Sequence, residues 1–119
     1  MKLNDYLQAV KRTNPELSNH YPDLNELHMV MGISTEANEL LDVYKKNLAY
    51  KKPIDEVNIK EEIGDLLWYL GNYCNIKGYD LEEIMETNIN KLKKRYPEKF
   101  TEENAINRNL KEERLILEQ

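Results

Sequence analysis

The sequence predicts an all-α protein: a four-helix-type bundle followed by a polar C-terminal tail. Apolar residues recur with helical spacing in four segments, and Pro, Gly or helix-capping residues separate these segments. No segment alternates apolar and polar residues as a half-buried strand would. The chain has 119 residues, which fits a single domain. We expect its core at about residues 20–97 and its tail at residues 98–119.

The first two predicted helices lead into a loop. The first covers about residues 3–13 and ends at Asn14-Pro15, because a residue before proline disfavours the helical conformation. The second starts near Asp23, a predicted N-cap, and continues to about residue 48. Residues 49–55, which include two lysines and a proline, are the predicted loop. The predicted buried side of the second helix consists of Leu24, Leu27, Met31, Leu41 and Tyr44.

The third and fourth predicted helices are bounded by clear start and stop signals. The third spans about residues 57–77, and Gly78 occupies the position of a C-terminal stop. Asp80 opens the fourth helix, with Glu83 as its capping-box partner, and this helix continues to about residue 95. The predicted core face of the third helix is Ile59, Ile63, Leu66, Leu67, Leu70 and Cys74. That of the fourth is Leu81, Ile84, Met85, Ile89 and Leu92.

The tail after the fourth helix is polar and charged. Thr101 is a predicted cap for one more short helix. For residues 110–117 two alternatives stay open: packing on a neighbouring subunit, or mobility.

Composition and charge limit the classes of function. The chain has a net charge of −5 and no broad basic face, so we expect no nucleic-acid partner. No apolar stretch is long enough to span a membrane, and the N-terminus lacks the apolar run of a signal peptide. The single cysteine, Cys74, excludes an internal disulfide and is interpreted as a small buried residue. We therefore expect a reducing, cytoplasmic setting.

Two pairs of carboxylates are the most informative pattern. Glu36 and Glu39 lie three residues apart on the second predicted helix, and Glu62 and Asp65 lie three apart on the third. Residues with this spacing point to one side of a helix, so antiparallel packing could bring all four to one pocket. Mg²⁺ would offset their repulsion, since it prefers hard oxygen ligands and keeps waters that a phosphate can displace. Each pair alone is common on solvated helices, but the apolar residues flanking both pairs favour a metal site.

A polar stripe on the fourth predicted helix could bind phosphates. Asn88, Lys91 and Arg95 follow one another at helical spacing. Asn88 could orient a ligand, while Lys91 and Arg95 could bind phosphate oxygens. The alternative is a solvated basic helix end, which interacts favourably with the helix dipole. Spacing alone favours that alternative.

Two aromatic residues follow the second acidic pair. Tyr69 comes one turn after Asp65 and faces the same way, so its ring could stack on a base or cover a metal pocket. Trp68 is the neighbouring candidate for a base contact. The alternative, ordinary core or interface packing, is favoured for Trp68 and equally weighted for Tyr69.

These residues resemble a known family. The stretch Gly32–Leu40 resembles the first half of the signature of the MazG-like, all-α NTP pyrophosphatases, and Glu61–Leu70 resembles the second half. The family pattern is ExxE, a variable spacer and ExxD, and here the spacer runs from Leu40 through Glu61. Asn88–Pro97 also resembles the segment that follows this motif. Three ordered segments are more specific than any one of them.

The resemblance implies Mg²⁺-dependent hydrolysis of a nucleoside or deoxynucleoside triphosphate to the monophosphate and pyrophosphate. Mn²⁺ is an expected substitute, and nucleotide-pool housekeeping is an expected purpose. The implied assembly is a homodimer or homotetramer with sites near the subunit contacts. The implied metal ligands are Glu36, Glu39, Glu62 and Asp65, with Glu61 assisting metal or water. The implied nucleotide contacts are Asn88, Lys91 and Arg95.

Two other functions remain as alternatives. One is a non-catalytic acidic helical module that binds a partner or a metal. The other is an enzyme that hydrolyses a phosphoribosyl-bound nucleotide instead of a free triphosphate. The intact acidic pairs and the polar stripe on the fourth helix argue against the first alternative.

Overall fold

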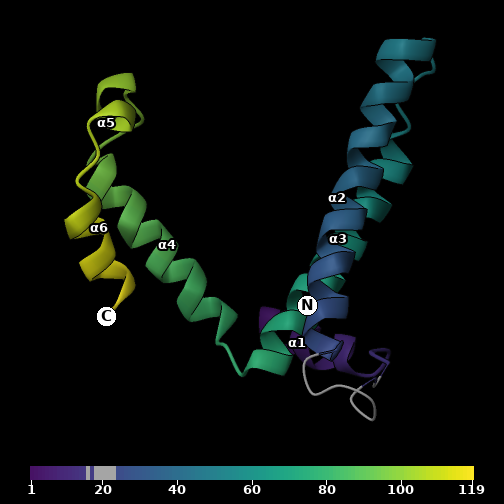
Figure 1. Cartoon of the computed structure of the whole chain (residues 1–119), viewed down its shortest axis with the longest axis horizontal. Helices are drawn as coiled ribbons and strands as arrows, with labels where there is room; N and C mark the ends of the chain where they lie inside the picture. Colours follow the sequence, from purple (N-terminus) through teal and green to yellow (C-terminus); the bar gives the residue numbers. More distant parts are fainter. Residues whose placement is uncertain (16, 18–23) are drawn as a thin grey trace. The chain divides into compact units, whose positions relative to one another are not determined.

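All regular structure in the described residues is helical, which confirms the predicted fold class. A computed structural model describes residues 1–15, 17 and 24–119 (Figure 1). The helices are α1 (Leu3–Lys11), α2 (Leu24–Tyr50), α3 (Glu56–Lys77), α4 (Leu81–Arg95), α5 (Glu102–Ile106) and α6 (Leu110–Leu117). They divide into two compact units, Met1–Tyr79 and Asp80–Gln119. The predicted N-cap Asp23 lies outside the described residues.

Local capping chemistry sets the ends of several helices where the sequence predicts them. The Asp55 carboxylate caps α3 by accepting from the backbone N–H groups of its second and third residues, at 3.1 Å each. Gly78 ends α3 with a positive φ of 69°, which a glycine adopts without strain. Asp80 caps α4 by accepting from the N–H of Glu83 at 3.2 Å. Thr101 caps α5 in the same way.

The first unit is built on an antiparallel hairpin of α2 and α3, which lie side by side in Figure 1. Helix α1 docks on the C-terminal half of α3 through two side-chain amides. Asn72 Nδ2 donates to the carbonyl of Val10 at 3.1 Å, and Asn75 Nδ2 donates to the carbonyl of Leu7 at 2.8 Å. Because Asn72 is fully buried, this bond satisfies a donor that water cannot reach.

The predicted buried side of α2 is wrong for the packing within this chain. Met29, Gly32 and Val43 are the buried residues of α2. The predicted residues Leu27, Met31, Leu41 and Tyr44 are 53%, 58%, 64% and 51% exposed. Helix α2 has apolar residues on more than one side, and α3 covers the side that includes the small residue Gly32. Periodicity identifies apolar faces but does not say which face a given neighbour covers.

Helix α4 shows the same difference between prediction and structure. None of its residues is buried. Ile84, Met85 and Ile89 from the predicted core face are 45%, 52% and 51% exposed.

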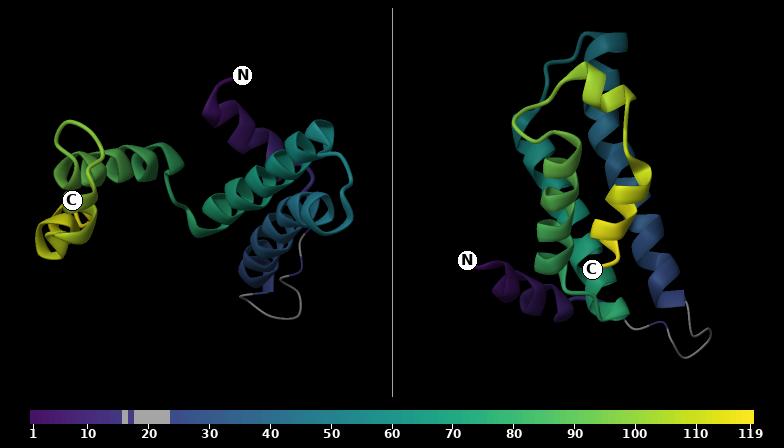
Figure 2. Two further views of the ribbon diagram at one scale, coloured as in Figure 1. Left: turned by 90° about the horizontal axis from the view of Figure 1, so that it is seen from above. Right: turned by 90° about the vertical axis from the view of Figure 1, so that its left-hand side faces the viewer.

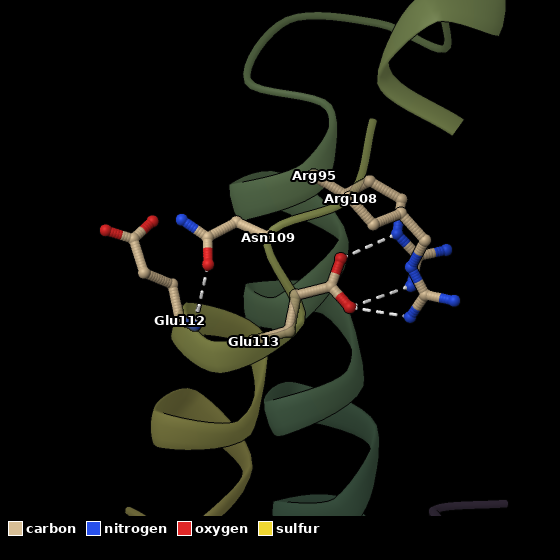
Figure 3. Close-up of polar contacts among 5 residues, drawn as sticks. All are labelled: Arg95, Arg108, Asn109, Glu112 and Glu113. Carbon is tan, nitrogen blue, oxygen red and sulfur yellow. Dashed lines mark hydrogen bonds and ion pairs between the residues drawn. The ribbon is translucent and has the colours of Figure 1, made fainter. Parts of the chain in front are cut away.

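In the second unit, α6 runs alongside α4 (Figures 1 and 2). The Glu113 carboxylate of α6 joins them, because it accepts from Arg95 Nε at 2.7 Å and from Arg95 Nη2 at 3.1 Å. It also accepts from Arg108 Nη2 at 2.6 Å (Figure 3). Glu113 is only 3% exposed. This packing of residues 110–117 on the same chain is neither of the two alternatives expected from the sequence.

Across the part of the chain that the structure describes, no helix combines the length and hydropathy needed to cross a bilayer.

Candidate functional site

Helices α2 and α3 bring three of the predicted carboxylates together. One oxygen each of Glu36, Glu62 and Asp65 lies within 4.8 Å of the others. Glu62 and Asp65 share a side of α3 because they are three residues apart, and Glu36 meets them from α2 across the hairpin. Glu36 and Glu62 are half-buried, and Asp65 is exposed. We call these three residues the acidic group.

Like-charge repulsion shapes the chemistry of the acidic group. A hydrogen bond with Glu36, followed by desolvation, raises the pKa of the Glu62 carboxyl. The negative charges of Glu36, Glu39 and Asp65 raise it further. Asp65 also contributes, after burial, to a raised pKa of the Tyr6 hydroxyl. A hard divalent cation would relieve this repulsion, and carboxylate oxygens are its preferred ligands. The donor set therefore fits Mg²⁺ or a similar ion.

The other two predicted acidic residues lie outside the acidic group. Glu39 is exposed, but its charge acts on Glu62. Glu61, next to Glu62 on α3, is also exposed. The structure thus joins three carboxylates closely, with Glu39 near them.

Beside the acidic group lies a polar hollow of about 490 Å³, toward the loop between α2 and α3. Its lining residues are Glu39, Asp42, Val43, Lys46, Lys52, Pro53, Asp55, Asn58 and Glu62. Since Glu62 belongs to both, the hollow and the acidic group are continuous. The sequence pattern does not predict this hollow, and of the two lysines in the predicted loop only Lys52 lines it.

Aromatic side chains lie on the side of the acidic group that is away from the hollow. The Tyr69 ring packs against Gly32, where a Cβ would come within 2.1 Å of two ring carbons. Tyr69 also meets Trp68 edge to face, with ring centroids 4.9 Å apart, and His28 at 5.9 Å. The Trp68 indole N–H donates to Thr13 Oγ1 at 2.8 Å, which ties the turn after α1 to α3. Trp68 thus has a structural contact, while the predicted base contact stays a prediction.

The predicted phosphate-binding residues belong to the second unit. Asn88 is exposed on α4, while Lys91 and Arg95 are half-buried. Arg95 is held by Glu113, and this contact raises the pKa of the guanidinium. Conversely, Arg95 and Arg108 lower the pKa of Glu113 to about 2. Glu113 and Arg108 are not predictable as a joined group from the sequence, because a charged residue in a polar tail gives no sign of burial.

The family model of the MazG nucleotide pyrophosphohydrolase domain matches residues 25–100. The chain belongs to this family. The MazG match spans α2, α3 and α4 and includes every predicted site residue, whereas Glu113 and helix α6 lie beyond it.

One curated relative also aligns with this MazG chain. The Gene 37 protein of Mycobacterium phage L5 is 29% identical over 72 residues. The alignment covers 57% of this chain and 63% of the phage protein, slightly less than two thirds of its length. No solved structure matches the chain.

Proposed function

We propose that this chain is a Mg²⁺-dependent nucleoside triphosphate pyrophosphohydrolase, which converts an NTP or dNTP to the monophosphate and pyrophosphate. The proposal rests on the acidic group: three carboxylates from two helices, close enough to share a cation, in a member of a nucleotide pyrophosphohydrolase family. Glu36, Glu62 and Asp65 are the proposed metal ligands, and Glu39 is the fourth carboxylate of the site. Mn²⁺ is the expected substitute, because it also accepts carboxylate oxygens.

In this proposal the acidic group holds the metal, and Glu39 and Glu61 act beside it. When bound, Mg²⁺ would neutralise charge on the phosphate oxygens and polarise the attacked phosphorus. The acidic group fixes where the cation, and with it the reacting phosphate, is held. Glu39 lies outside the acidic group but close to Glu62, so it is the better placed of the two α2 carboxylates to orient water and accept its proton. Glu61 assists as a neighbouring negative charge.

The remaining predicted residues bind the nucleotide in this proposal. Tyr69, with Trp68 beside it, presents an aromatic surface to the base. Asn88, Lys91 and Arg95 contact the phosphates. The pairing of Arg95 does not remove its use in anion binding, because Arg95 and Arg108 together balance a single carboxylate, Glu113. Arg95, Arg108 and Glu113 together therefore carry one net positive charge.

We also propose that the protein works as a homodimer or homotetramer. Large apolar side chains stay exposed on α2, and such faces are commonly covered in assemblies. These residues are Leu27, Val30, Met31, Leu41, Tyr44 and Leu48. Light scattering at micromolar concentration should give a dimer or tetramer, and a monomer alone would contradict this part of the proposal.

A substrate panel tests the proposed reaction. Pyrophosphate release is measured from the common NTPs and dNTPs with Mg²⁺, with Mn²⁺ and with a chelator. We expect metal-dependent release from at least one triphosphate, with the monophosphate as the other product. Hydrolysis of a phosphoribosyl-bound nucleotide alone would move the activity to that substrate class. Binding of Mg²⁺ without any hydrolysis would favour a non-catalytic module.

A further inference from the structure

The hollow beside the acidic group is lined by two cationic side chains of the first unit, Lys46 and Lys52. Glu39 and Glu62 border the hollow on the side of the acidic group, and Lys46, Lys52 and Asn58 also line it. A triphosphate is strongly anionic, and Lys91 and Arg95, which are proposed above as phosphate contacts, belong to the second unit. Within the first unit, carboxylates and metal ions alone would leave part of the triphosphate charge unmatched. Lysines in a hollow continuous with the metal ligands are suited to that charge.

Two of the four carboxylates that line the hollow already have partners. The Asp42 carboxylate forms an ion pair at 2.8 Å with the ammonium group of Lys46, which lies one turn away on α2. Asp55 caps α3 with its carboxylate. By contrast, no ion pair among the described residues includes Lys52. The ammonium group of Lys52 is therefore the hollow's available positive charge.

The backbone around Lys52 is anchored to the end of α2. The N–H of Lys51 donates to the carbonyl of Asn47 at 3.0 Å. The Asn47 side chain in turn donates to the carbonyl of Lys52 at 2.8 Å. These bonds hold the start of the loop against the helix, so the Lys52 side chain begins from a fixed point at the hollow.

The residues on one side of α3 give the site a direction. Asn58, Glu62, Asp65 and Tyr69 follow at spacings of four, three and four, which keeps them on one face. At about 1.5 Å per residue, this face extends roughly 16 Å. It passes from the polar hollow, through the carboxylates, to the aromatic ring. Phosphates fit the first end, and a base fits the other.

We propose that this hollow is the first unit's subsite for the terminal phosphates of the substrate, with Lys52 as a cationic contact in addition to Lys91 and Arg95, and Asn58 as a hydrogen-bond donor. The base then lies toward Tyr69. This inference rests on the proposed pyrophosphohydrolase function and adds the direction in which the nucleotide lies. The leaving pyrophosphate departs from the loop end of the α2–α3 hairpin.

Lys52→Ala tests the subsite, with two comparison variants. Lys51→Ala removes the same charge from the neighbouring residue, which does not line the hollow. Lys52→Arg keeps the charge. Calorimetry with Mg²⁺ measures the Kd of inorganic pyrophosphate, and separately that of the monophosphate of the nucleotide which the wild type hydrolyses fastest. Turnover of that nucleotide gives KM and kcat.

We expect Lys52→Ala to weaken pyrophosphate binding and raise KM by about tenfold, a typical loss for one charge-assisted contact. Monophosphate binding should stay at the wild-type value, Lys51→Ala should behave as wild type, and Lys52→Arg should restore most of the affinity. Equal effects of Lys52→Ala and Lys51→Ala, or weakening of the monophosphate alone, would overturn the subsite while an active wild type upholds the function. A wild type that neither hydrolyses a triphosphate nor binds pyrophosphate would overturn both.

Discussion

Gly32 of α2 lies directly against the ring of Tyr69 on α3, so closely that a Cβ at position 32 would come within 2.1 Å of the ring. This contact sets how near the two helices approach. Glu36 is one turn after Gly32, and Asp65 is one turn before Tyr69. Because the helices are antiparallel, the close contact of Gly32 with Tyr69 brings Glu36 and Asp65 to the same level of the hairpin. The packing of a glycine therefore supports the geometry of the acidic group.

Replacing Gly32 with alanine should destabilise the hairpin despite the better helix propensity of alanine. Overpacking costs about 1–3 kcal/mol, and the propensity gain offsets about 1 kcal/mol of that. We expect a net loss of roughly 1 kcal/mol in the free energy of unfolding, measured by urea denaturation. Mg²⁺ should also raise the melting temperature less than in the wild type, because the acidic group is pushed apart.

Gly64→Ala is the matched control for Gly32→Ala. Gly64 also lies inside a helix, but nothing is within 4 Å of a Cβ built there. This variant should gain up to about 1 kcal/mol from helix propensity alone. If Gly32→Ala is stabilised as much as Gly64→Ala, the contact with Tyr69 does not limit the approach of the helices.

The Glu113 contact should give the second unit a characteristic acid sensitivity. Arg95 and Arg108 lower the pKa of Glu113 from 4.5 to about 2 in the folded chain. A lowered folded pKa means that the stabilisation is complete above pH 4.5 and is lost as the pH falls toward 2. Thermal unfolding should show a constant advantage of the wild type over Glu113→Gln above pH 5. That advantage should shrink between pH 4.5 and pH 2.

Glu112→Gln provides the comparison for Glu113→Gln. Glu112 is the adjacent residue on α6, and its ion pair with Lys94, at 2.9 Å, has both side chains nearly half exposed. Exposed pairs contribute little, so Glu112→Gln should melt close to the wild type at every pH. Similar curves for the two variants would show that Glu113 is not the residue that joins α4 and α6.

Lys91 and Arg95 should differ in what their replacement changes. Lys91→Ala should raise KM by about ten- to a hundredfold, the loss expected for a charged phosphate contact, and leave the melting temperature near that of the wild type. Arg95→Ala should lower the melting temperature as well, because it leaves Glu113 buried with Arg108 alone. Steady-state kinetics and thermal unfolding separate the two effects. A Lys91→Ala variant with unchanged KM would remove Lys91 from the phosphate site.

Local signals made the helix boundaries predictable from sequence. Asp55, Gly78 and Asp80 act on backbone groups within a few residues, so their effects are encoded in short stretches. The acidic pairs were predictable for the same reason, since a spacing of three places two side chains on one helix face.

The features that could not be predicted from the sequence depend on contacts between residues that are far apart in the chain. The side of α2 that meets α3 depends on the fit of Gly32 to Tyr69, and several apolar faces of α2 compete with it. The burial of Glu113 depends on a partner on another helix, Arg95. The hollow beside the acidic group depends on where the loop returns Lys52, which no periodicity encodes.

Mg²⁺-dependent pyrophosphate release by Asp65→Ala is the most direct measurement of the central claim, that the acidic group holds a catalytic metal. Glu56→Gln, an exposed acidic residue in the first turn of α3, is the matched control. Asp65→Ala should lose at least about a hundredfold in turnover, because a lost ligand removes charge neutralisation and positioning. Without metal it should melt at or above the wild-type temperature, since one repelling charge is gone. Wild-type turnover by Asp65→Ala, with an unchanged stabilisation by Mg²⁺, would contradict the claim.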